Sequence, residues 1–332
     1  MIKRIYLART EDEFLWKTSS SGGVFGHLVM NMIENHHGVC YGAKFTSDFR
    51  VIHDRAESLK EAEAFRGSKY LQSDMKNCYK LIINDLKNGR KVLFSGTPCQ
   101  VMAVKKFVPL DLQEKLLLVD ILCHGAPSPK VFRDYLNVQE LFYKEKAVEV
   151  KFRGKKLKDS VQDMYIKFES GKEYKSFGTQ DIYYKLFSNE MISRVSCANC
   201  PFANTNRPAD ITLSDYWGES DKIPENFKKK NGLSGVFINT YKGEIFWQES
   251  TKNMTIAEST FSVCGQSTLN HPIAMGKNRS GFWDLYLKQG IMPAFEKYFG
   301  SYKKMCRMRI IKNLLNETGV LRIIHKIKGM KR

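Results

Sequence analysis

Two short apolar runs constrain the fold of this chain more than any other feature of its sequence. The runs KVLFSG (91–96) and KLLLVDIL (115–122) have the length and composition of strands buried on both faces, and each leads through a turn into a helical pattern. Strands that alternate with helices in this way are typical of a parallel or mixed sheet covered by helices. We therefore predict an α/β fold with a mixed sheet and flanking helices.

A different pattern begins near residue 147. The segments VEVKFRG, MYIKFES and KEYKSFG alternate apolar and polar residues and are separated by turns, which predicts an antiparallel meander. A chain of 332 residues is long enough for two lobes. We predict an N-terminal α/β flavin-binding lobe at 1–146, a C-terminal lobe with the meander and a CxxC motif at 147–300, and a basic amphipathic helical tail at 301–332.

The tail carries much of the positive charge. The net charge is +18, and residues 301–332 hold ten Lys or Arg against one acid, Glu317. Apolar residues recur there at about helical spacing, with a break near Gly319, so the tail is expected to bind a membrane surface or a partner, or to dock on the body by its apolar stripe. Charge concentrated in a tail does not by itself indicate nucleic-acid binding, and we expect none.

The start of the chain has no apolar core typical of a secretory signal, and no apolar run is long enough to cross a bilayer. We expect a cytoplasmic protein whose tail permits peripheral contact with the inner membrane surface. In that reducing compartment a disulfide framework is not expected, so clustered cysteines indicate metal or redox ligands.

Four of the eight cysteines occupy such positions. Cys99 and Cys123 follow the two apolar runs, so neighbouring strands would bring them to one sheet edge, while Cys197 and Cys200 form a CxxC loop. Four thiolates in a tetrahedral arrangement indicate zinc or an iron-sulfur cluster, and spacing alone leaves both open. It also leaves open that Cys99 and Cys123 are small buried core residues. Cys40, Cys78, Cys264 and Cys306 have no motif around them, and we expect them in the core.

Six segments in order resemble one family across nearly the whole chain. They are KTSSSGGVF, RGSKYLQS, VLFSGTPCQV, CHGAPSPKVF, SCANCPFA followed by Arg207, and DITLSDYWG, and the series is similar to the coenzyme F420 hydrogenase/dehydrogenase beta-subunit family. Members are flavoproteins with iron-sulfur clusters that pass electrons between FAD, the clusters and a deazaflavin or another organic acceptor, and proteins of bacterial surface-polysaccharide gene clusters share the module. The resemblance implies that Cys99, Cys123, Cys197 and Cys200 ligate a 4Fe-4S cluster, which would bridge the two lobes.

The resemblance also concerns the electron donor. Many relatives begin with a ferredoxin-like run of closely spaced cysteines, whereas no cysteine precedes Cys40 here. We therefore expect electrons to come from a separate donor such as ferredoxin.

A Ser/Gly-rich turn leads into a helix near the start of the chain. Such a turn offers N–H groups, hydroxyls and a positive helix end to a pyrophosphate, although serines also cap helices routinely. With the resemblance, we expect FAD at this turn, with Gly96 and Thr97 close to its ring system. Lys69 is expected to neutralise phosphate or to lie near the flavin ring. The residues of the turn are Thr18, Ser19, Ser20, Ser21, Gly22 and Gly23.

The catalytic candidates are Lys69 and His124. His124 adjoins Cys123 and is expected to give a proton to substrate, to donate a hydrogen bond to a cluster sulfur, or only to cap the strand end. Asp215, Tyr216 and Trp217 are candidates for the substrate face, although a tryptophan is by default a core residue.

These features together predict an iron-sulfur flavoprotein oxidoreductase. It would pass electrons between a 4Fe-4S cluster, FAD and a small organic acceptor, of the deazaflavin type or from a polysaccharide pathway. One alternative is a zinc-stabilised binding module that its basic tail recruits to a membrane or a partner. Another is a transferase with Cys99 as nucleophile and His124 as base.

Overall fold

The chain folds into two compact units in a computed structural model that describes residues 2–153, 163–218, 223–227 and 232–317. The first unit combines residues 1–125 with 196–273, and the second combines 126–195 with 274–332. These bounds differ from the predicted division at 146, which groups the CxxC motif with the meander. The structure places that motif in the first unit instead, because two strands that follow it pair into the sheet of that unit.

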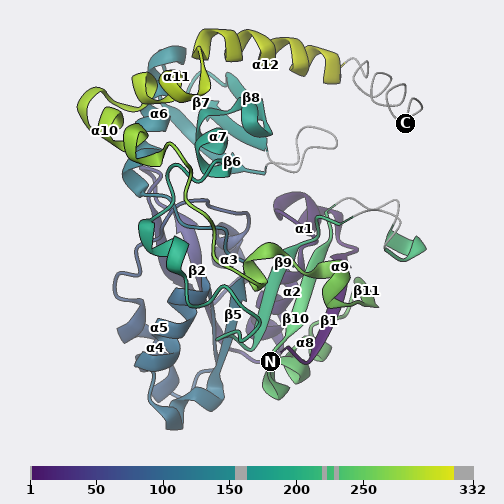
Figure 1. The fold of residues 1–332 in the computed structure, drawn as a ribbon. Helices are drawn as coiled ribbons and strands as arrows, with labels where there is room; N and C mark the ends of the chain where they lie inside the picture. The colour runs from purple at the N-terminus through teal and green to yellow at the C-terminus, as the bar shows by residue number, and fades with distance from the viewer. Residues whose placement is uncertain (1, 154–162, 219–222, 228–231, 318–332) are drawn as a thin grey trace. The chain divides into compact units, whose positions relative to one another are not determined.

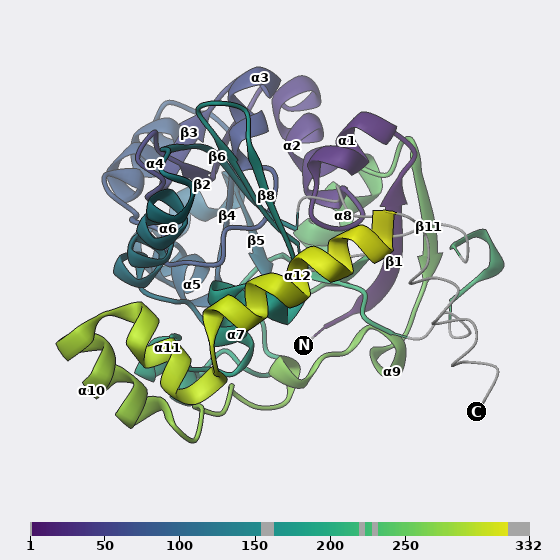
Figure 2. The ribbon, with the colours of Figure 1, turned by 90° about the horizontal axis from the view of Figure 1, so that it is seen from above.

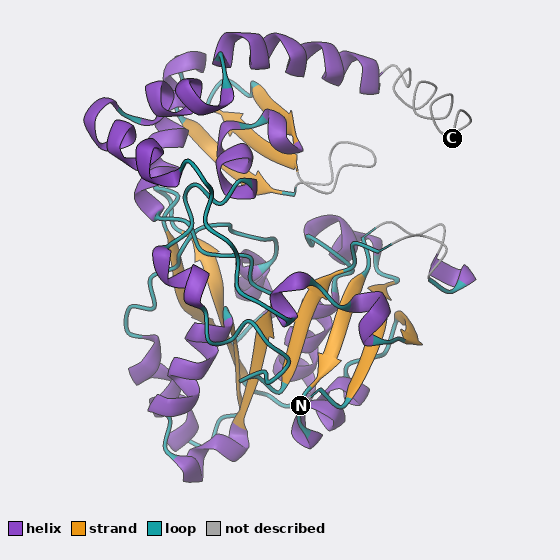
Figure 3. Cartoon of the chain, viewed as in Figure 1, coloured by secondary structure: helices purple, strands orange, loops and turns teal. Residues whose placement is uncertain are grey.

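The first unit is built on an eight-stranded mixed sheet (Figures 1 and 3). Its order is β11-β1-β10-β9-β5-β4-β2-β3. The pairs β2–β4, β4–β5 and β5–β9 are parallel, and the remaining pairs are antiparallel. The strands are β1 (Arg4–Thr10), β2 (Val39–Phe45), β3 (Val51–Ala56), β4 (Val92–Gly96), β5 (Leu116–Ile121), β9 (Ile211–Asp215), β10 (Ser234–Ile238) and β11 (Met254–Glu258).

Helices cover both faces of this sheet, because successive residues of the central strands face opposite sides. Leu93 and Leu117 pack in one core with α2 (Val24–Met30), the π-helix Asn31–Asn35, α3 (Leu59–Ala62) and α8 (Tyr241–Glu249). Val92 and Leu116 pack in a second core with α4 (Cys78–Lys87) and α5 (Pro98–Phe107). The predicted α/β class with a mixed sheet and flanking helices is thus confirmed.

The loops that carry the predicted site residues lie at one edge of the sheet. The parallel strands β4, β5 and β9 end at this edge, and β1 ends there too, because β1 and β9 are both antiparallel to β10. In sheets of this kind the loops beyond the carboxyl ends of the strands form the usual binding region. The sites predicted after β1, β4 and β5 therefore share one edge of one unit.

The second unit contains the predicted meander. The strands β6 (Ala147–Phe152), β7 (Asp163–Phe168) and β8 (Glu173–Phe177) pair antiparallel in the order β6-β7-β8. Its helices are α6 (Pro129–Tyr143), α7 (Ile182–Ser188), α10 (Arg279–Gln289), α11 (Ile291–Phe299) and α12 (Tyr302–Glu317). The buried carboxylate of Asp181 accepts hydrogen bonds from the hydroxyls of Tyr135 (2.6 Å) and Tyr174 (2.7 Å).

The tail begins as the helix α12, which Figure 2 shows continuing from α11. Within residues 302–311 its buried side chains are Tyr302, Cys306 and Arg309, and the guanidinium of Arg309 lies 4.4 Å from the ring centroid of Tyr174. The predicted break near Gly319 and the rest of the tail lie outside the described residues. Across the described part of the chain, none of the helices combines the length and apolar character needed to cross a membrane.

Candidate functional site

The four candidate cysteines all lie in the first unit. Cys99 stands in the first turn of α5, directly beyond β4, and Cys123 stands two residues beyond β5. The parallel pairing of β4 with β5 confirms the predicted adjacency of the two strands, with Gly96 opposite Asp120. Cys197 lies in the 3₁₀ turn Val195–Asn199, and Cys200 follows that turn. The expectation that two lobes share these residues is not met, since residues 196–273 belong to the first unit.

The surroundings of the Cys123 thiol disfavour its charged form. Burial, reinforced by the negative charges of Cys99, Cys197 and Cys200 as thiolates, raises the pKa of Cys123 to about 12. Among the described residues, no group of three or more His, Cys, Asp or Glu side chains converges tightly enough to hold a single metal ion. A bound metal would lower the pKa of the Cys123 thiol instead of raising it, because a thiol that ligates a metal is deprotonated.

A chain of hydrogen bonds supports the turn that carries Cys99. The Thr97 hydroxyl lies 3.1 Å from the Cys99 sulfur, and both the amide and the hydroxyl of Thr97 donate to the Gln100 side chain at 3.0 Å. The Gln100 amide donates to the Ser73 hydroxyl at 2.8 Å, and that hydroxyl lies 2.9 Å from Nδ1 of the buried His53. No sequence pattern predicted these hydrogen bonds, since the residues that form them are ordinary polar residues from segments far apart in sequence.

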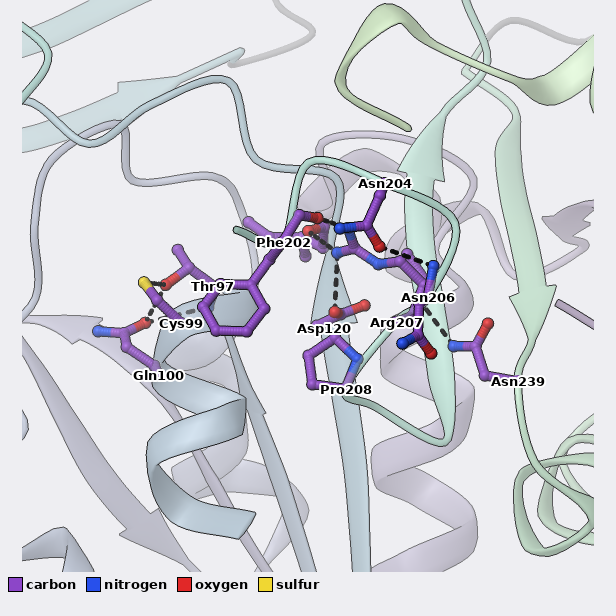
Figure 4. A network of polar contacts seen from close by, with 12 residues as sticks. Thr97, Cys99, Gln100, Asp120, Phe202, Asn204, Asn206, Arg207, Pro208 and Asn239 are labelled. Carbon is purple, nitrogen blue, oxygen red and sulfur yellow. Dashed lines mark hydrogen bonds and ion pairs between the residues drawn. The ribbon is translucent and has the colours of Figure 1, made fainter. Parts of the chain in front are cut away.

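A buried ion pair supports the CxxC loop (Figure 4). The Arg207 guanidinium donates to the Asp120 carboxylate at 2.7 Å and to the Phe202 carbonyl at 2.8 Å. Burial raises the pKa of Asp120 to about 6, against the opposing effect of the Arg207 charge. The sequence did carry a signal for this pair, because an acid inside the apolar run KLLLVDIL needs a partner when it is buried.

His124 is held between two neighbours of the first unit. Its Nε2 lies 2.8 Å from the Gln266 side-chain oxygen, and its ring lies 4.9 Å from that of Trp217, between centroids. Burial lowers the pKa of His124, against the raising effects of Gln266 and Asp215. Trp217 is 52 % exposed, so the default expectation of a core tryptophan was wrong. An exposed indole thus packs on the imidazole of the residue that follows Cys123.

The predicted flavin turn lies against a second predicted segment. The Ser68 amide and hydroxyl donate to the Ser20 hydroxyl at 2.7 and 2.9 Å, and Arg66 donates to Thr18 at 3.4 Å. The hydroxyls of Thr18, Ser19 and Ser21 donate to backbone carbonyls. The hydroxyls of Thr18 and Ser19 therefore serve the local backbone, and that of Ser21 joins the turn to Leu233, just before β10. The turn is also contacted by the cation of Arg66, which no sequence pattern indicated.

Glycine is required at two positions of this turn for different reasons. Gly23 has φ +83°, a left-handed conformation that side chains disfavour. A Cβ on Gly22 would lie 2.4 Å from the Ala8 carbonyl oxygen, so the backbone approach there excludes any side chain.

The ammonium of Lys69 donates hydrogen bonds to backbone carbonyls. Its ammonium lies 2.9–3.2 Å from four carbonyl oxygens, those of residues 64–67. Burial lowers its pKa to about 7, although the carbonyls favour the charged form. Gly96 lies at the end of β4 and Thr97 contacts Cys99, while their place close to the flavin ring stays a prediction.

Comparison with known proteins places the chain in a family. The family model for the C terminus of the coenzyme F420 hydrogenase/dehydrogenase beta subunit matches residues 89–262, a segment that contains all four cysteines. A chain from the xenon-derivatized F420-reducing NiFe hydrogenase complex of Methanosarcina barkeri has a similar fold, with a TM-score of 0.52 and 17% identity over 90% of this chain and 91% of that chain. No curated protein matches the sequence. Since the family match spans more than half of the residues, the chain belongs to the coenzyme F420 hydrogenase/dehydrogenase beta-subunit family.

Proposed function

We propose that this chain is an oxidoreductase that holds a 4Fe-4S cluster on Cys99, Cys123, Cys197 and Cys200 and binds FAD at the adjacent loops. The observation that carries the proposal is that three separate segments with these four cysteines meet at the sheet edge that also receives the loop 18–23. When bound, the cluster would transfer single electrons and the flavin would pair them for an organic acceptor.

The chemistry of the donors fits such a group. Thiolates are soft ligands that select zinc, copper or iron-sulfur clusters, and the family to which the chain belongs is named for redox enzymes. The contacts of Cys99 and His124 favour a ligand role over a nucleophile with its base, because the Cys99 sulfur contacts Thr97 and the His124 ring contacts Gln266. The hydrogen bonds of Gln100 support the turn that carries Cys99. The ion pair of Arg207 with Asp120 supports the loop that carries Cys197 and Cys200.

For FAD, the support is the juxtaposition of two loops. The turn 18–23 and the segment around Ser68 touch through Ser20, and Arg66 lies beside the turn, where its charge would face a pyrophosphate. Trp217 and His124 would offer flat surfaces to an aromatic acceptor next to Cys123. Reduced ferredoxin or a similar protein would supply electrons, and the acceptor would be a small organic molecule.

The test is anaerobic purification followed by a visible spectrum and by quantitation of iron, sulfide, zinc and released flavin. We expect a coloured protein with both cofactors. The variant Cys200→Ser should lose iron, while Cys264→Ser should retain it, because Cys264 lies in the core of the same unit with Ser259 as a polar partner at 3.2 Å. A colourless protein that contains zinc and releases no flavin would favour the zinc-stabilised module instead.

A further inference from the structure

The most deeply buried ion pair lies beside the candidate cluster ligands. The side chains of Arg207 and Asp120 are 1 % and 0 % exposed. No second ion pair in the described ranges has both partners buried to that degree. Two charges removed from water pay a desolvation penalty that their attraction often fails to recover, so such a pair is a poor way to add stability. We therefore examine which backbone segments this ion pair holds in position.

The Arg207 guanidinium joins the segment after Cys200 to the segment before Cys123. One terminal nitrogen donates to the Phe202 carbonyl, two residues after Cys200. The other donates to the Asp120 carboxylate and to the Ile121 carbonyl (3.3 Å), two residues before Cys123. Arg207 thus connects main chain next to one candidate ligand with main chain next to another (Figure 4).

Both ends of this connection are fixed. Asp120 belongs to the central strand β5, and the Asn239 amide donates at 2.9 Å to the hydroxyl of the neighbouring Thr212 on β9. On the loop side, the Asn204 amide donates to the Pro201 carbonyl at 2.7 Å, which folds the segment after Cys200 on itself. A planar guanidinium with several rigid donors suits a link between two such backbones, whereas a lysine ammonium offers no fixed fork.

We propose that Arg207 is a positioning residue that sets the distance between the CxxC loop and Cys123 before any metal binds. This inference rests on the proposed cluster site. Outer-shell partners of metal ligands typically change metal affinity about 10–100-fold when they are replaced. Arg207→Lys keeps the charge opposite Asp120 and loses the fork, so it should weaken the positioning with the least disturbance of the buried carboxylate.

The matched control is Arg55→Lys. Arg55 likewise pairs with a carboxylate of the first unit, donating two bonds to Asp85 at 2.8 and 3.1 Å, but it lies on the edge strand β3 and, among the described residues, joins none of the segments that carry the four candidate ligands. In anaerobically purified protein, the rate of iron loss to a chelator should rise about 10–100-fold in Arg207→Lys and stay near the wild-type rate in Arg55→Lys. Equal rates in Arg207→Lys and wild type would overturn the proposal.

A second measurement separates this proposal from the proposed function. In metal-free protein, we would compare the alkylation rates of Cys197 and Cys200 with that of Cys99, which lies on α5 and serves as an internal reference. Arg207→Lys should accelerate alkylation of the CxxC pair relative to Cys99, whether or not the native protein holds iron. Protein without iron that still shows this acceleration would refute the cluster and retain the positioning role. Unchanged relative rates would refute the positioning role itself.

The outer face of α12 carries an independent second inference. Over residues 302–311, one side of this helix is buried in the second unit, and the other side exposes Met308, Ile310 and Ile311 to 46 %, 55 % and 51 %. The exposed basic residues Lys303, Lys304 and Arg307 lie on the same outer side. At a membrane surface, exposed apolar side chains of a helix enter the headgroup region while neighbouring cations pair with anionic lipids.

We infer that α12 binds the surface of an anionic lipid bilayer through this outer face. The sequence supports the choice of partner, because residues 301–332 carry ten Lys or Arg and only one acid. A second copy of this face would place like charges against each other, which disfavours self-association.

The test is co-sedimentation of the full chain with phosphatidylcholine vesicles with and without phosphatidylglycerol. We expect binding only to the anionic vesicles, with release at high salt. The double variant Ile310→Ser, Ile311→Ser should weaken binding about tenfold or more, since it removes apolar surface that enters the interface. Leu287→Ser, at another exposed apolar residue of the second unit, should bind as wild type. Binding unchanged by the double variant, or binding to nucleic acid but not to vesicles, would overturn the inference.

Discussion

The buried His53 should make the stability of the first unit depend on pH. Its Nε2 donates to the Ser95 carbonyl at 3.0 Å, so Nδ1 accepts from the Ser73 hydroxyl, and the ring is neutral. Burial lowers the pKa of His53 from 6.5 to about 4. Between pH 6.5 and 4, His53 is protonated in the unfolded chain but stays neutral in the folded chain. The stabilising contribution is therefore complete above pH 6.5 and is lost as the pH falls toward 4.

The size of this effect follows from the shift. Each unit of pKa difference is worth about 1.36 kcal/mol, so the change from 6.5 to about 4 amounts to about 3 kcal/mol. His27 and His124 also have lowered pKa values and act in the same direction, whereas Asp120 has a raised one and acts against it. The pH dependence of the wild-type stability therefore does not isolate the contribution of His53. That contribution is obtained by comparing wild type with a variant that lacks the His53 side chain.

The suitable variant is His53→Gln, whose amide can donate to Ser95 and accept from Ser73 but does not titrate. Urea unfolding at several pH values between 7 and 4, followed by tryptophan fluorescence, gives the free energy of unfolding; three of the four tryptophans lie in the first unit. Wild type should lose about 3 kcal/mol more than His53→Gln over this range. If both proteins lose the same free energy, His53 is not held neutral by its burial, and the reasoning fails.

Three further changes test individual contacts by urea unfolding. Gly23→Ala, whose Cβ would lie 2.7 Å from a neighbouring methyl group, should cost more than Gly67→Ala, which has a similar positive φ and open space; we expect about 2–3 against about 1 kcal/mol. Asp181→Asn weakens the acceptor of two buried tyrosine hydroxyls and should destabilise the second unit by about 1–3 kcal/mol; an unchanged midpoint would contradict this. Lys69→Met leaves four backbone carbonyls without their donor and should cost a similar amount, whereas a lysine that serves only a bound cofactor would leave the cofactor-free protein unaffected.

The local patterns of the sequence were sufficient for the secondary structure and for part of the site. The run 115–122 is apolar on both faces because β5 is covered by cores on both sides of the sheet, and the run 91–96 is its parallel neighbour. That pairing placed Cys99 and Cys123 at one edge, as expected from their positions after the strands. The alternating pattern of the meander likewise predicted β6, β7 and β8.

Pairing between distant segments decided what the sequence left open. The CxxC loop joins the first unit because β9 and β10 enter its sheet, and no local signal near Cys197 specifies a strand partner about ninety residues earlier. The exposure of Trp217 and the four carbonyls around Lys69 depend in the same way on the path of the surrounding backbone.

The sequence by itself determined which residues could ligate a metal and where each stands on its strand or loop, because these properties depend on residue type and on near neighbours. Only the tertiary structure decided that Arg207 reaches Asp120, and hence what holds the ligands in place. A buried charge requires a partner, but the partner's identity depends on which distant segment the fold brings within hydrogen-bonding distance.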